Sequence, residues 1–369
     1  MKPTAAFIAT FMIAAYAISA GASSQNKPNP TQKTPSPRTV AKAAPIPGPL
    51  YANRSDAMAV ADGIAERRGL DRDWVRQAIA QSHYMPAIAK AITPPPVGVP
   101  KNWTLYRSRF IDAVRIRAGV KFWQANQDSL QRAQAETGVP AEIIVGVIGV
   151  ETIYGQQIGT FRVMDALTTL AFDFPAVHPR AQARSAFFVA ELEEFLVLTA
   201  STRTNPMALR GSYAGAMGLP QFMPSSWAKY AVDFDGDGRV DLFHSDADVI
   251  GSVANYFKAF KWQRGMVTHY PVQFDPPTLD MASLMAPDIL PTFTPAAFIA
   301  RGALVTGDAL QHPGPLALIE LQNGDAAPQY VAGTENFYAI TRYNWSSYYA
   351  MAVIELGREV ATAMGSMPK

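Results

Sequence analysis

The chain has 369 residues, of which 49% are hydrophobic and 17% charged, and its formal net charge at pH 7 is +2. This composition is typical of a folded protein with two or three compact units, and it excludes a wholly disordered chain. The small net charge does not favour a nucleic-acid-binding protein, which would show a concentrated basic stripe. Because the chain has no cysteine, disulfides, thiolate metal sites and a cysteine nucleophile are excluded.

The N-terminus has the pattern of an export signal. Lys2 precedes an apolar run over residues 4–20, and small residues follow at 20–22, so we predict a cleavable signal peptide over residues 1–22. A retained anchor helix stays open, although the run is at the short limit for crossing a bilayer. Residues 23–49 hold seven prolines and few large apolar groups, which predicts an extended linker.

The remaining chain predicts an α+β fold that is predominantly α-helical. Residues 50–135 show helical patterns, with Asp56 and Asp71 as expected caps of the first two helices. The segment 94–100, PPPVGVP, breaks regular structure. Helical patterns continue from residue 136. Residues 265–330 carry many prolines and short β-branched or aromatic pieces, which predicts a small β-rich subdomain before a C-terminal segment over 331–369.

Glu151 is the strongest catalytic candidate. It ends an apolar run over residues 143–150 that consists only of Ile, Val and Gly. Pro140 and Gly155 suit the start and stop of a helix, although a strand stays possible. In such a setting desolvation should raise the pKa of the carboxyl, as a glycosidase general acid requires. The alternative is a glutamate that emerges at a helix end and pairs with an arginine.

A second feature is the acidic segment over residues 233–248, DFDGDGRVDLFHSDAD. Alternating aspartates followed by glycine resemble the start of an EF-hand loop, in which hard cations bind oxygen ligands. Position 12 is His244 instead of glutamate, so Asp248 is the alternative closing ligand. We predict a structural calcium ion and no organic cofactor; a metal-free acidic turn is the other interpretation. The predicted ligands are Asp233, Asp235, Asp237, Arg239 through its carbonyl, and Asp248.

Several long motifs resemble the lytic murein transglycosylase B family, over roughly residues 50–360. The motifs, in chain order, are VGVIGVETIYG (145–155), RVMDALTTLAFDFP (162–175), GSYAGAMGLPQFMPSSW (211–227), GSVANYFKA (251–259) and ENFYAITRYN (335–344). The resemblance implies a lysozyme-like core over 136–264, with the N-terminal helical region and the small β subdomain beside it. It also implies a monomeric enzyme whose partners are peptidoglycan glycan strands, with cell-wall synthesis proteins as a further class of partner and no nucleic acid.

The resemblance implies cleavage of the bond between N-acetylmuramic acid and N-acetylglucosamine without water, leaving a 1,6-anhydromuramoyl end. Glu151 falls on the family's catalytic glutamate, which acts first as acid and then as base. A hydrolase would use two carboxylates; Asp165 and Asp173 are the nearest candidates, and we expect structural roles for both. A water-using muramidase and a non-catalytic peptidoglycan-binding scaffold are the competing functions.

The resemblance also implies a substrate-binding lining. Ser212 and Gln221 are expected to bond the sugar's polar groups, while Phe222 and Met223 form an apolar wall. Arg180 and Arg184 lie where the family has basic residues facing the peptide stem, in a segment longer than the family pattern. The remaining expected lining residues are Tyr256, Tyr338, Tyr343 and Asn344.

Because the chain has no cysteine that could carry a lipid, we expect the exported enzyme in the periplasm without a lipid anchor.

Overall fold

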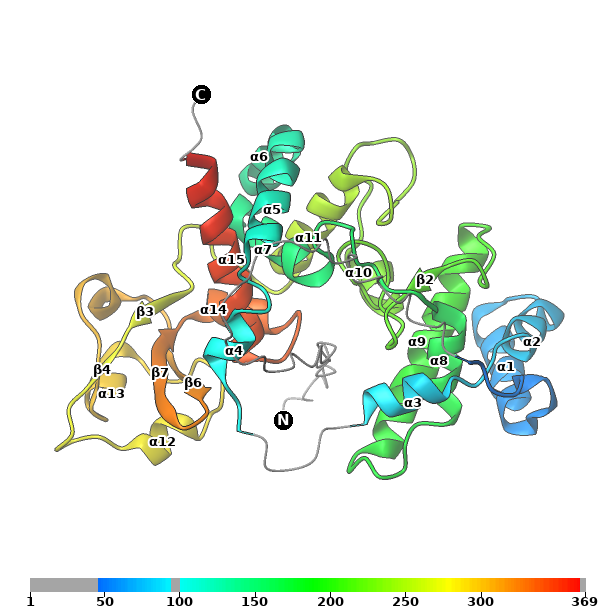
Figure 1. The fold of residues 1–369 in the computed structure, drawn as a ribbon, viewed down its shortest axis with the longest axis horizontal. Helices are drawn as coiled ribbons and strands as arrows, with labels where there is room; N and C mark the ends of the chain where they lie inside the picture. Colours follow the sequence, from blue (N-terminus) through cyan, green and yellow to red (C-terminus); the bar gives the residue numbers. More distant parts are fainter. Residues whose placement is uncertain (1–45, 94–99, 366–369) are drawn as a thin grey trace, which may run out of the picture.

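The computed structural model describes residues 46–93 and 100–365. The predicted signal peptide, residues 23–45 of the predicted linker and residues 94–99 of the proline-rich break lie outside those residues. Helices dominate the described residues and the strands are short, which confirms the predicted fold class. Three regions follow one another along the longest axis (Figure 1). The N-terminal helices lie at one end, the longer strands at the other, and the core helices between them.

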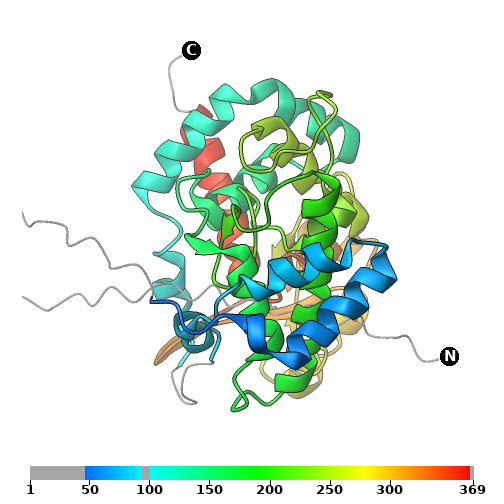
Figure 2. The ribbon, with the colours of Figure 1, turned by 90° about the vertical axis from the view of Figure 1, so that its right-hand side faces the viewer.

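Helices α1 (Ser55–Arg68), α2 (Arg72–Ala80) and α3 (Pro86–Ile92) cover α8 (Val163–Phe172) and α9 (Ala181–Ser201), as Figure 2 shows. An ion pair between Arg68 on α1 and Glu193 on α9 joins these layers, with Nε and Oε1 2.6 Å apart. The N-terminal helices therefore form a cap on this end of the core.

Of the two predicted helix caps, one is confirmed. Asp71 caps α2 by accepting a hydrogen bond from the Trp74 amide at 2.7 Å. The prediction for Asp56 is wrong, because α1 begins at Ser55 and Asp56 lies in its first turn. Its carboxylate pairs with the Arg54 guanidinium at 2.7 Å.

Helix α7 (Ala141–Thr152) is the centre of the core. Ten of its residues are buried, which explains why its sequence is apolar on all sides. It packs against α5 (Ala113–Ala125), α6 (Gln127–Thr137), α11 (Asp246–Ala259) and α15 (Ser347–Gly365). Around them lie α4 (Trp103–Arg107), α10 (Pro224–Tyr230) and α14 (Glu335–Thr341).

Glycines let α7 and α15 approach each other closely. A Cβ atom on Gly146 would lie 2.2 Å from the Val353 carbonyl oxygen, and one on Gly357 would lie 2.1 Å from the Glu142 carbonyl oxygen. No other residue fits at either point without moving a helix. The close contact brings the start of α15 beside the end of α7.

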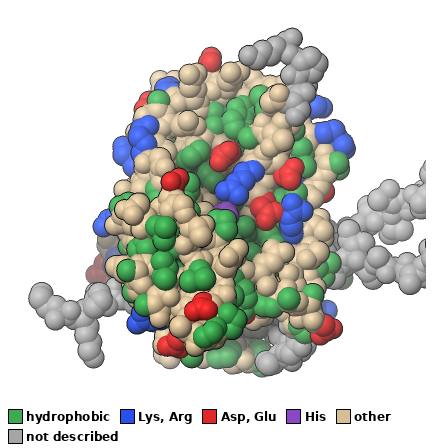
Figure 3. Space-filling model, turned by 90° about the vertical axis from the view of Figure 1, so that its left-hand side faces the viewer, with side chains coloured by type: hydrophobic (Ala, Val, Ile, Leu, Met, Phe, Trp, Pro, Cys, Tyr) green, Lys and Arg blue, Asp and Glu red, His purple; other side chains and the backbone are tan. Residues whose placement is uncertain are grey.

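The predicted β-rich segment forms a three-stranded antiparallel sheet in the order β3–β7–β6. A small hydrophobic cluster, distinct from the main core, includes Leu318 of this sheet together with Leu284 and Phe298. On the outer face of this region, acidic and basic side chains are interspersed among apolar ones (Figure 3). The elements are β3 (His269–Pro271), β4 (Gln273–Phe274), α12 (Met281–Met285), α13 (Pro295–Ile299), β5 (Ala303–Leu304), β6 (Ala317–Asn323) and β7 (Ala326–Gly333); β4 pairs with β5, and β1 (Phe161–Arg162) pairs with β2 (Arg210–Gly211).

Among the residues that the structure describes, no single helix is both long and apolar enough to cross a membrane. The pair α6 and α7 would meet that test together by length and composition, but the two helices are bent by 117° at their break. Most of α7 is buried inside the protein.

Candidate active site

Glu151 is the penultimate residue of α7, and its side chain is partly buried at the apolar end of that helix. Its Oε1 accepts a hydrogen bond from the Tyr349 hydroxyl at 2.6 Å. Burial raises the pKa of Glu151 to about 7, and the hydrogen bond opposes this rise because it stabilises the carboxylate. The predicted rise in pKa is therefore confirmed. A carboxyl of this pKa can give and take a proton near neutral pH.

The chain turns sharply directly after this helix. Ile153 has φ 52° and Tyr154 has φ 55°, and Gly155 follows at φ 86°. A left-handed conformation costs a non-glycine residue about 1–3 kcal/mol. Because the turn begins at Ile153, the helix ends at Thr152, earlier than the stop that the sequence predicts at Gly155. The strained turn fixes the direction in which the chain leaves Glu151.

Two sets of contacts hold this turn. The Thr152 hydroxyl donates to the Leu219 carbonyl at 2.9 Å and accepts from the Gly155 amide at 3.1 Å. The Tyr154 side chain fills a slot between α5 and α7, where a Cβ atom on either Gly119 or Gly149 would lie 2.4 Å from its hydroxyl oxygen. That hydroxyl is buried and has no hydrogen-bond partner. Packing alone therefore keeps the ring in place.

Three tyrosines surround the Glu151 carboxyl. Burial, reinforced by the negative charge of Glu151, raises the pKa values of Tyr343, Tyr349 and Tyr106 above the usual value. The rings of Tyr343 and Tyr349 are stacked, with centroids 6.3 Å apart. These phenols stay protonated at neutral pH, so Tyr349 acts on Glu151 only as a hydrogen-bond donor.

Sequence reasoning missed Tyr349 and Tyr106. A signal for Tyr349 does exist, since Tyr349, Val353 and Leu356 share one face of a helix by their spacing. A tyrosine on an otherwise apolar face requires a partner for its hydroxyl. The sequence offers no comparable signal for Tyr106, which reaches the site only because α4 packs against α15.

The loop over residues 211–223 lies beside the turn after α7. Ser212 shapes this loop, because its Oγ accepts hydrogen bonds from the amides of Ala214 at 3.2 Å and Ala216 at 3.1 Å. The Tyr343 hydroxyl donates to the Pro220 carbonyl at 2.5 Å and fixes the other half of the loop. Ser212 is thus brought into the same region as Glu151, with its Oγ accepting two backbone amides.

Gln221 ties the loop to the segment that follows Glu151. Its Nε2 donates to the carbonyls of Gly218 at 2.9 Å and Ile158 at 3.2 Å, and its backbone is left-handed at φ 52°. The side chain is partly exposed, which leaves its Oε1 available. Phe222 and Met223 are buried, so they back the loop.

The other expected lining residues are mainly structural in this arrangement. Tyr256 is buried and donates its hydroxyl to the Arg342 carbonyl at 2.6 Å. The Tyr338 hydroxyl accepts from the Arg342 guanidinium at 3.2 Å, and the Tyr338 ring packs edge-on against Trp345. Asn344 is buried. The hydroxyls of Tyr256 and Tyr338 therefore bond to Arg342 and not to Glu151.

The two acidic residues considered as second carboxylates are both engaged elsewhere. Asp173 accepts from the Tyr51 hydroxyl at 2.5 Å and pairs with Arg54 at 3.0 Å. Asp165 accepts from the His83 amide at 3.0 Å. Both therefore tie the N-terminal segment to α8, which agrees with the structural roles expected for them.

The two arginines expected to face a peptide stem lie at the start of α9. Arg180 is exposed, whereas Arg184 is partly buried. Burial and the positive charge of Arg180 lower the pKa of Arg184.

The acidic loop gathers three of its predicted ligands. Asp233, Asp235 and Asp248 each place a carboxylate oxygen within 4.8 Å of the others, a spacing that suits one hard cation. Asp237 lies outside this group, because its carboxylate accepts from the Arg239 amide at 2.9 Å and pairs with the Arg239 guanidinium at 3.2 Å. The backbone carbonyl of Arg239 stays a predicted ligand. The closing ligand in this group is Asp248, which is 1% exposed.

Comparisons with known proteins agree with this arrangement. The family model described as "Transglycosylase SLT domain" matches residues 53–358. Membrane-bound lytic murein transglycosylase B of Escherichia coli K12 is 38% identical over 321 residues, which cover 85% of this chain and 84% of that protein.

Two solved structures are also similar. The Escherichia coli lytic transglycosylase SLT35 in complex with calcium has a TM-score of 0.75 at 38% identity, covering 86% of this chain and 96% of that one. SltB3 from Pseudomonas aeruginosa in complex with NAG-anhNAM-pentapeptide has a TM-score of 0.69 at 27% identity, covering 84% of this chain and 78% of that one. The chain thus belongs to the SLT-domain transglycosylases, the enzyme family that includes the lytic murein transglycosylases.

Proposed function

We propose that this enzyme cleaves the β-1,4 bond between N-acetylmuramic acid and N-acetylglucosamine in peptidoglycan without water, leaving a 1,6-anhydromuramoyl end. The observation that carries the proposal is the setting of Glu151: a pKa of about 7, one phenolic hydrogen bond, and burial rather than a second carboxylate as the cause of the raised pKa. The SltB3 complex with NAG-anhNAM-pentapeptide supports an anhydro product in the same family.

In the first step the protonated Glu151 gives its proton to the glycosidic oxygen, and the bond between that oxygen and the anomeric carbon breaks. The carboxylate then takes the proton of the C6 hydroxyl, whose oxygen bonds to the anomeric carbon. Glu151 ends protonated again, so atoms and charge balance without water. The Tyr349 hydroxyl stabilises the carboxylate between the two steps.

We assign substrate contacts to the loop beside Glu151. The free side-chain oxygen of Gln221 and the hydroxyl of the partly exposed Ser212 are the polar groups that contact the sugar. Phe222, Met223 and Tyr343 support the wall behind them, and the more distant lining residues hold this wall in place through the contacts described above.

Mass spectrometry of digested sacculi tests the proposal against its competitors. An anhydro end lacks one water relative to a reducing end. Anhydro ends are the expected product; reducing ends alone would establish a water-using muramidase. Binding of sacculi with no cleavage would establish a scaffold.

We also propose that the acidic loop binds calcium as a structural brace through Asp233, Asp235 and Asp248. The Asp248 carboxylate accepts from the amides of Phe234 and Asp241, both at 2.7 Å, so a cation there would join both ends of the loop to the start of α11. The SLT35 complex with calcium supports this choice of ion.

Finally, we propose export to the periplasm. The support is the sequence of residues 1–22 and the absence of a cysteine that could carry a lipid. N-terminal sequencing of the protein recovered from a periplasmic fraction tests this, with cleavage after residue 20 or 22 as the expected result.

A further inference from the structure

Glu191, on α9, is a buried carboxylate outside the set of residues assigned to the reaction, and it is 2% exposed. Its Oε1 accepts from the Ser225 hydroxyl at 2.6 Å, and its Oε2 accepts from the Ser225 amide at 2.9 Å. Burial raises the pKa of Glu191, and these two hydrogen bonds oppose the rise. Burying a carboxylate costs free energy unless hydrogen bonds compensate for the lost water, so Glu191 and Ser225 hold each other in place.

Glu191 supplies a cap that the start of α10 lacks. The N-cap residue, Met223, makes no side-chain cap hydrogen bond, and the first helical residue, Pro224, has no amide hydrogen. The Ser225 amide is therefore the first free donor of this helix, and a carboxylate 34 residues away satisfies it. Because α9 and α10 pack against each other, this carboxylate fixes the point at which the loop over residues 211–223 enters α10.

The same loop holds Gln221 in a strained conformation. Its φ of 52° lies in the left-handed region, which a residue other than glycine keeps only when its surroundings fix it. On the upstream side, two side-chain hydroxyls hold the carbonyls of Leu219 and Pro220, at 2.9 and 2.5 Å. On the downstream side, Ser225 lies four residues further along the chain. The strained residue is thus anchored on both sides, and Glu191 provides a downstream anchor.

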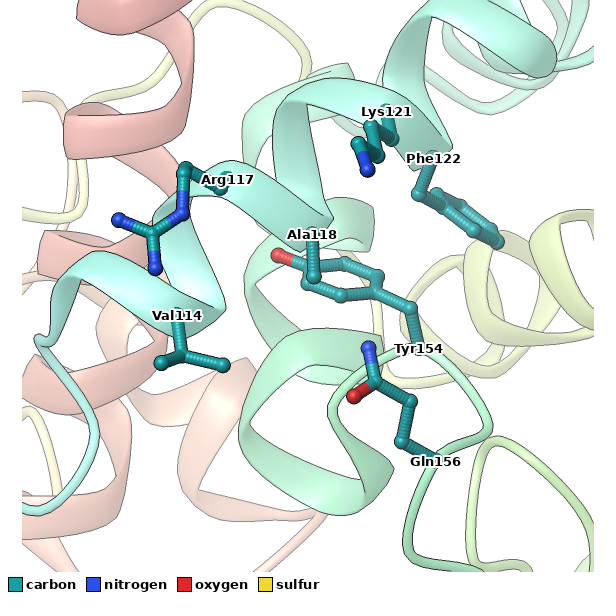
Figure 4. A pocket seen from close by; sticks show the side chains of 7 residues that line it. All are labelled: Val114, Arg117, Ala118, Lys121, Phe122, Tyr154 and Gln156. Atoms are coloured by element: carbon teal, nitrogen blue, oxygen red, sulfur yellow. The ribbon is translucent and has the colours of Figure 1, made fainter.

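The segment to which Gln221 is tied is held separately. The Gln221 Nε2 donates to the carbonyl of Ile158, which belongs to the segment that leaves Glu151. Figure 4 shows the Tyr154 ring of that segment directed toward α5, where it fills the slot described above. Since packing holds this side, the position of Gln221 relative to Glu151 depends on how its own loop is anchored.

We propose that Glu191 is a positioning residue of the reaction, which holds Ser225 so that the free Oε1 of Gln221 points at the bound sugar. This inference rests on the proposed function, in which Gln221 contacts the sugar. Glu191 itself touches no substrate. Without its carboxylate the start of α10 loses its cap, the Gln221 backbone relaxes from its strained conformation, and the Oε1 moves away from the sugar.

The first test compares three variants on soluble, uncrosslinked glycan strands. Glu191→Met removes both hydrogen bonds at similar side-chain length, and we expect kcat/KM to fall roughly tenfold, as for the loss of one hydrogen bond to the substrate. In Glu191→Gln the amide group can accept from the Ser225 amide and donate to its hydroxyl, so kcat/KM should stay within about twofold of the parent's. Glu193→Met, on the same helix, is the matched control. Because Glu193 pairs with Arg67 and Arg68, this variant should lower the Tm and leave kcat/KM unchanged.

A double-mutant cycle separates positioning from a merely structural role. If Glu191 acts through Gln221, Glu191→Met should change kcat/KM by less than about twofold in a Gln221→Ala background. Ser225→Ala removes one of the two hydrogen bonds and keeps the backbone amide. It should lower kcat/KM by about threefold in the parent and show the same coupling to Gln221, so the cycle gives a result even where Glu191→Met does not fold.

Equal losses in the parent and the Gln221→Ala backgrounds would overturn the inference, and so would a Glu191→Met enzyme with the parent's kcat/KM. Failure of the proposed function is distinguishable, because it appears as reducing ends among the parent's products whatever the coupling between Glu191 and Gln221.

Discussion

Two regions of this protein each bury a carboxylate, Asp248 almost completely and Glu151 in part, and they surround it in opposite ways. Asp248, in the acidic loop, accepts hydrogen bonds from the amides of Phe234, Asp235 and Asp241. Glu151, at the end of α7, accepts from the Tyr349 hydroxyl, and this is the hydrogen bond that lowers its pKa. The acidic loop is polar, whereas α7 is apolar on all sides.

The number and kind of donors decides what each carboxylate can do. Several backbone amides hold a charged carboxylate in one geometry and organise the chain around it. A single phenol in an apolar setting leaves a carboxyl whose proton can leave and return near neutral pH. Asp248 is therefore suited to a structural brace and Glu151 to proton transfer.

The largest expected effect is that of Glu151→Gln, which removes the proton carrier and keeps the shape. We expect the rate of sacculus solubilisation to fall by roughly 10²- to 10⁴-fold. The exposed Glu136 on α6 is the control, and Glu136→Gln should change the rate by less than about twofold. A Glu151→Gln enzyme with the parent's rate would refute its catalytic role.

The same variant should change stability with pH. The folded carboxyl keeps its proton up to a pKa of about 7, whereas the unfolded one loses it near the ordinary value of 4.5. Ionisation of the buried carboxyl therefore lowers the free energy of unfolding. The loss grows as the pH rises between these two pKa values and is constant above the higher one. The Tm of Glu151→Gln should match the parent's near pH 4 and exceed it at pH 8.

The next largest effect is expected at the strained turn. Tyr154→Ala empties the slot between Gly119 and Gly149, which should lower the free energy of unfolding by about 2–4 kcal/mol. Water would then reach Glu151 more easily, so the alkaline limb of the pH–rate profile should move to lower pH. Tyr154→Phe is the control: it removes a hydroxyl without a partner and should be neutral or stabilising. A Tyr154→Ala enzyme with the parent's pH profile would show that the turn does not set the environment of Glu151.

Asp248→Asn tests the structural role of the carboxylate in the acidic loop. The amide cannot accept all three backbone hydrogen bonds, so we expect a loss of about 1–3 kcal/mol in the free energy of unfolding. In the parent, chelation should lower the Tm and calcium restore it; the variant should show neither change. Asp237→Asn should keep the calcium response, because its carboxylate lies outside the group of three. If both variants lost the calcium response equally, Asp237 would be a ligand as well, as in a full EF-hand loop.

The smallest effect is that of Tyr349→Phe, which leaves Glu151 without its donor. Because this hydrogen bond lowers the pKa of Glu151, its loss should move the alkaline limb of the pH–rate profile to higher pH. The rate should fall by roughly three- to tenfold, since the carboxylate loses a stabilising partner. Tyr348→Phe is the matched control, because that hydroxyl donates to the Gln322 carbonyl instead. Equal shifts in both would contradict a specific role for Tyr349.

Local sequence was sufficient where a property depends on neighbouring residues. The apolar run before Glu151, with Pro140 ahead of it, favours a buried helix and predicts a raised pKa, both of which the structure has. The Asp71 cap and the β-rich segment near the C-terminus were also predictable from neighbouring residues. The end of α7 was not predictable, because left-handed Ile153 and Tyr154 are tolerated only through contacts with α5 and the loop over 211–223.

By itself, the sequence determined which carboxyl would be apolar, which segment would be acidic, and which family motifs lie in order along the chain. The tertiary structure alone decided the partners of those groups. Tyr349 meets Glu151 across 198 residues because glycines on α7 and α15 let the two helices touch. Asp237 turns to Arg239 while Asp248 closes the acidic group, because the position of α11 fixes one side chain and local hydrogen bonds fix the other. Such choices depend on which helices pack together, and spacing along the chain does not encode them.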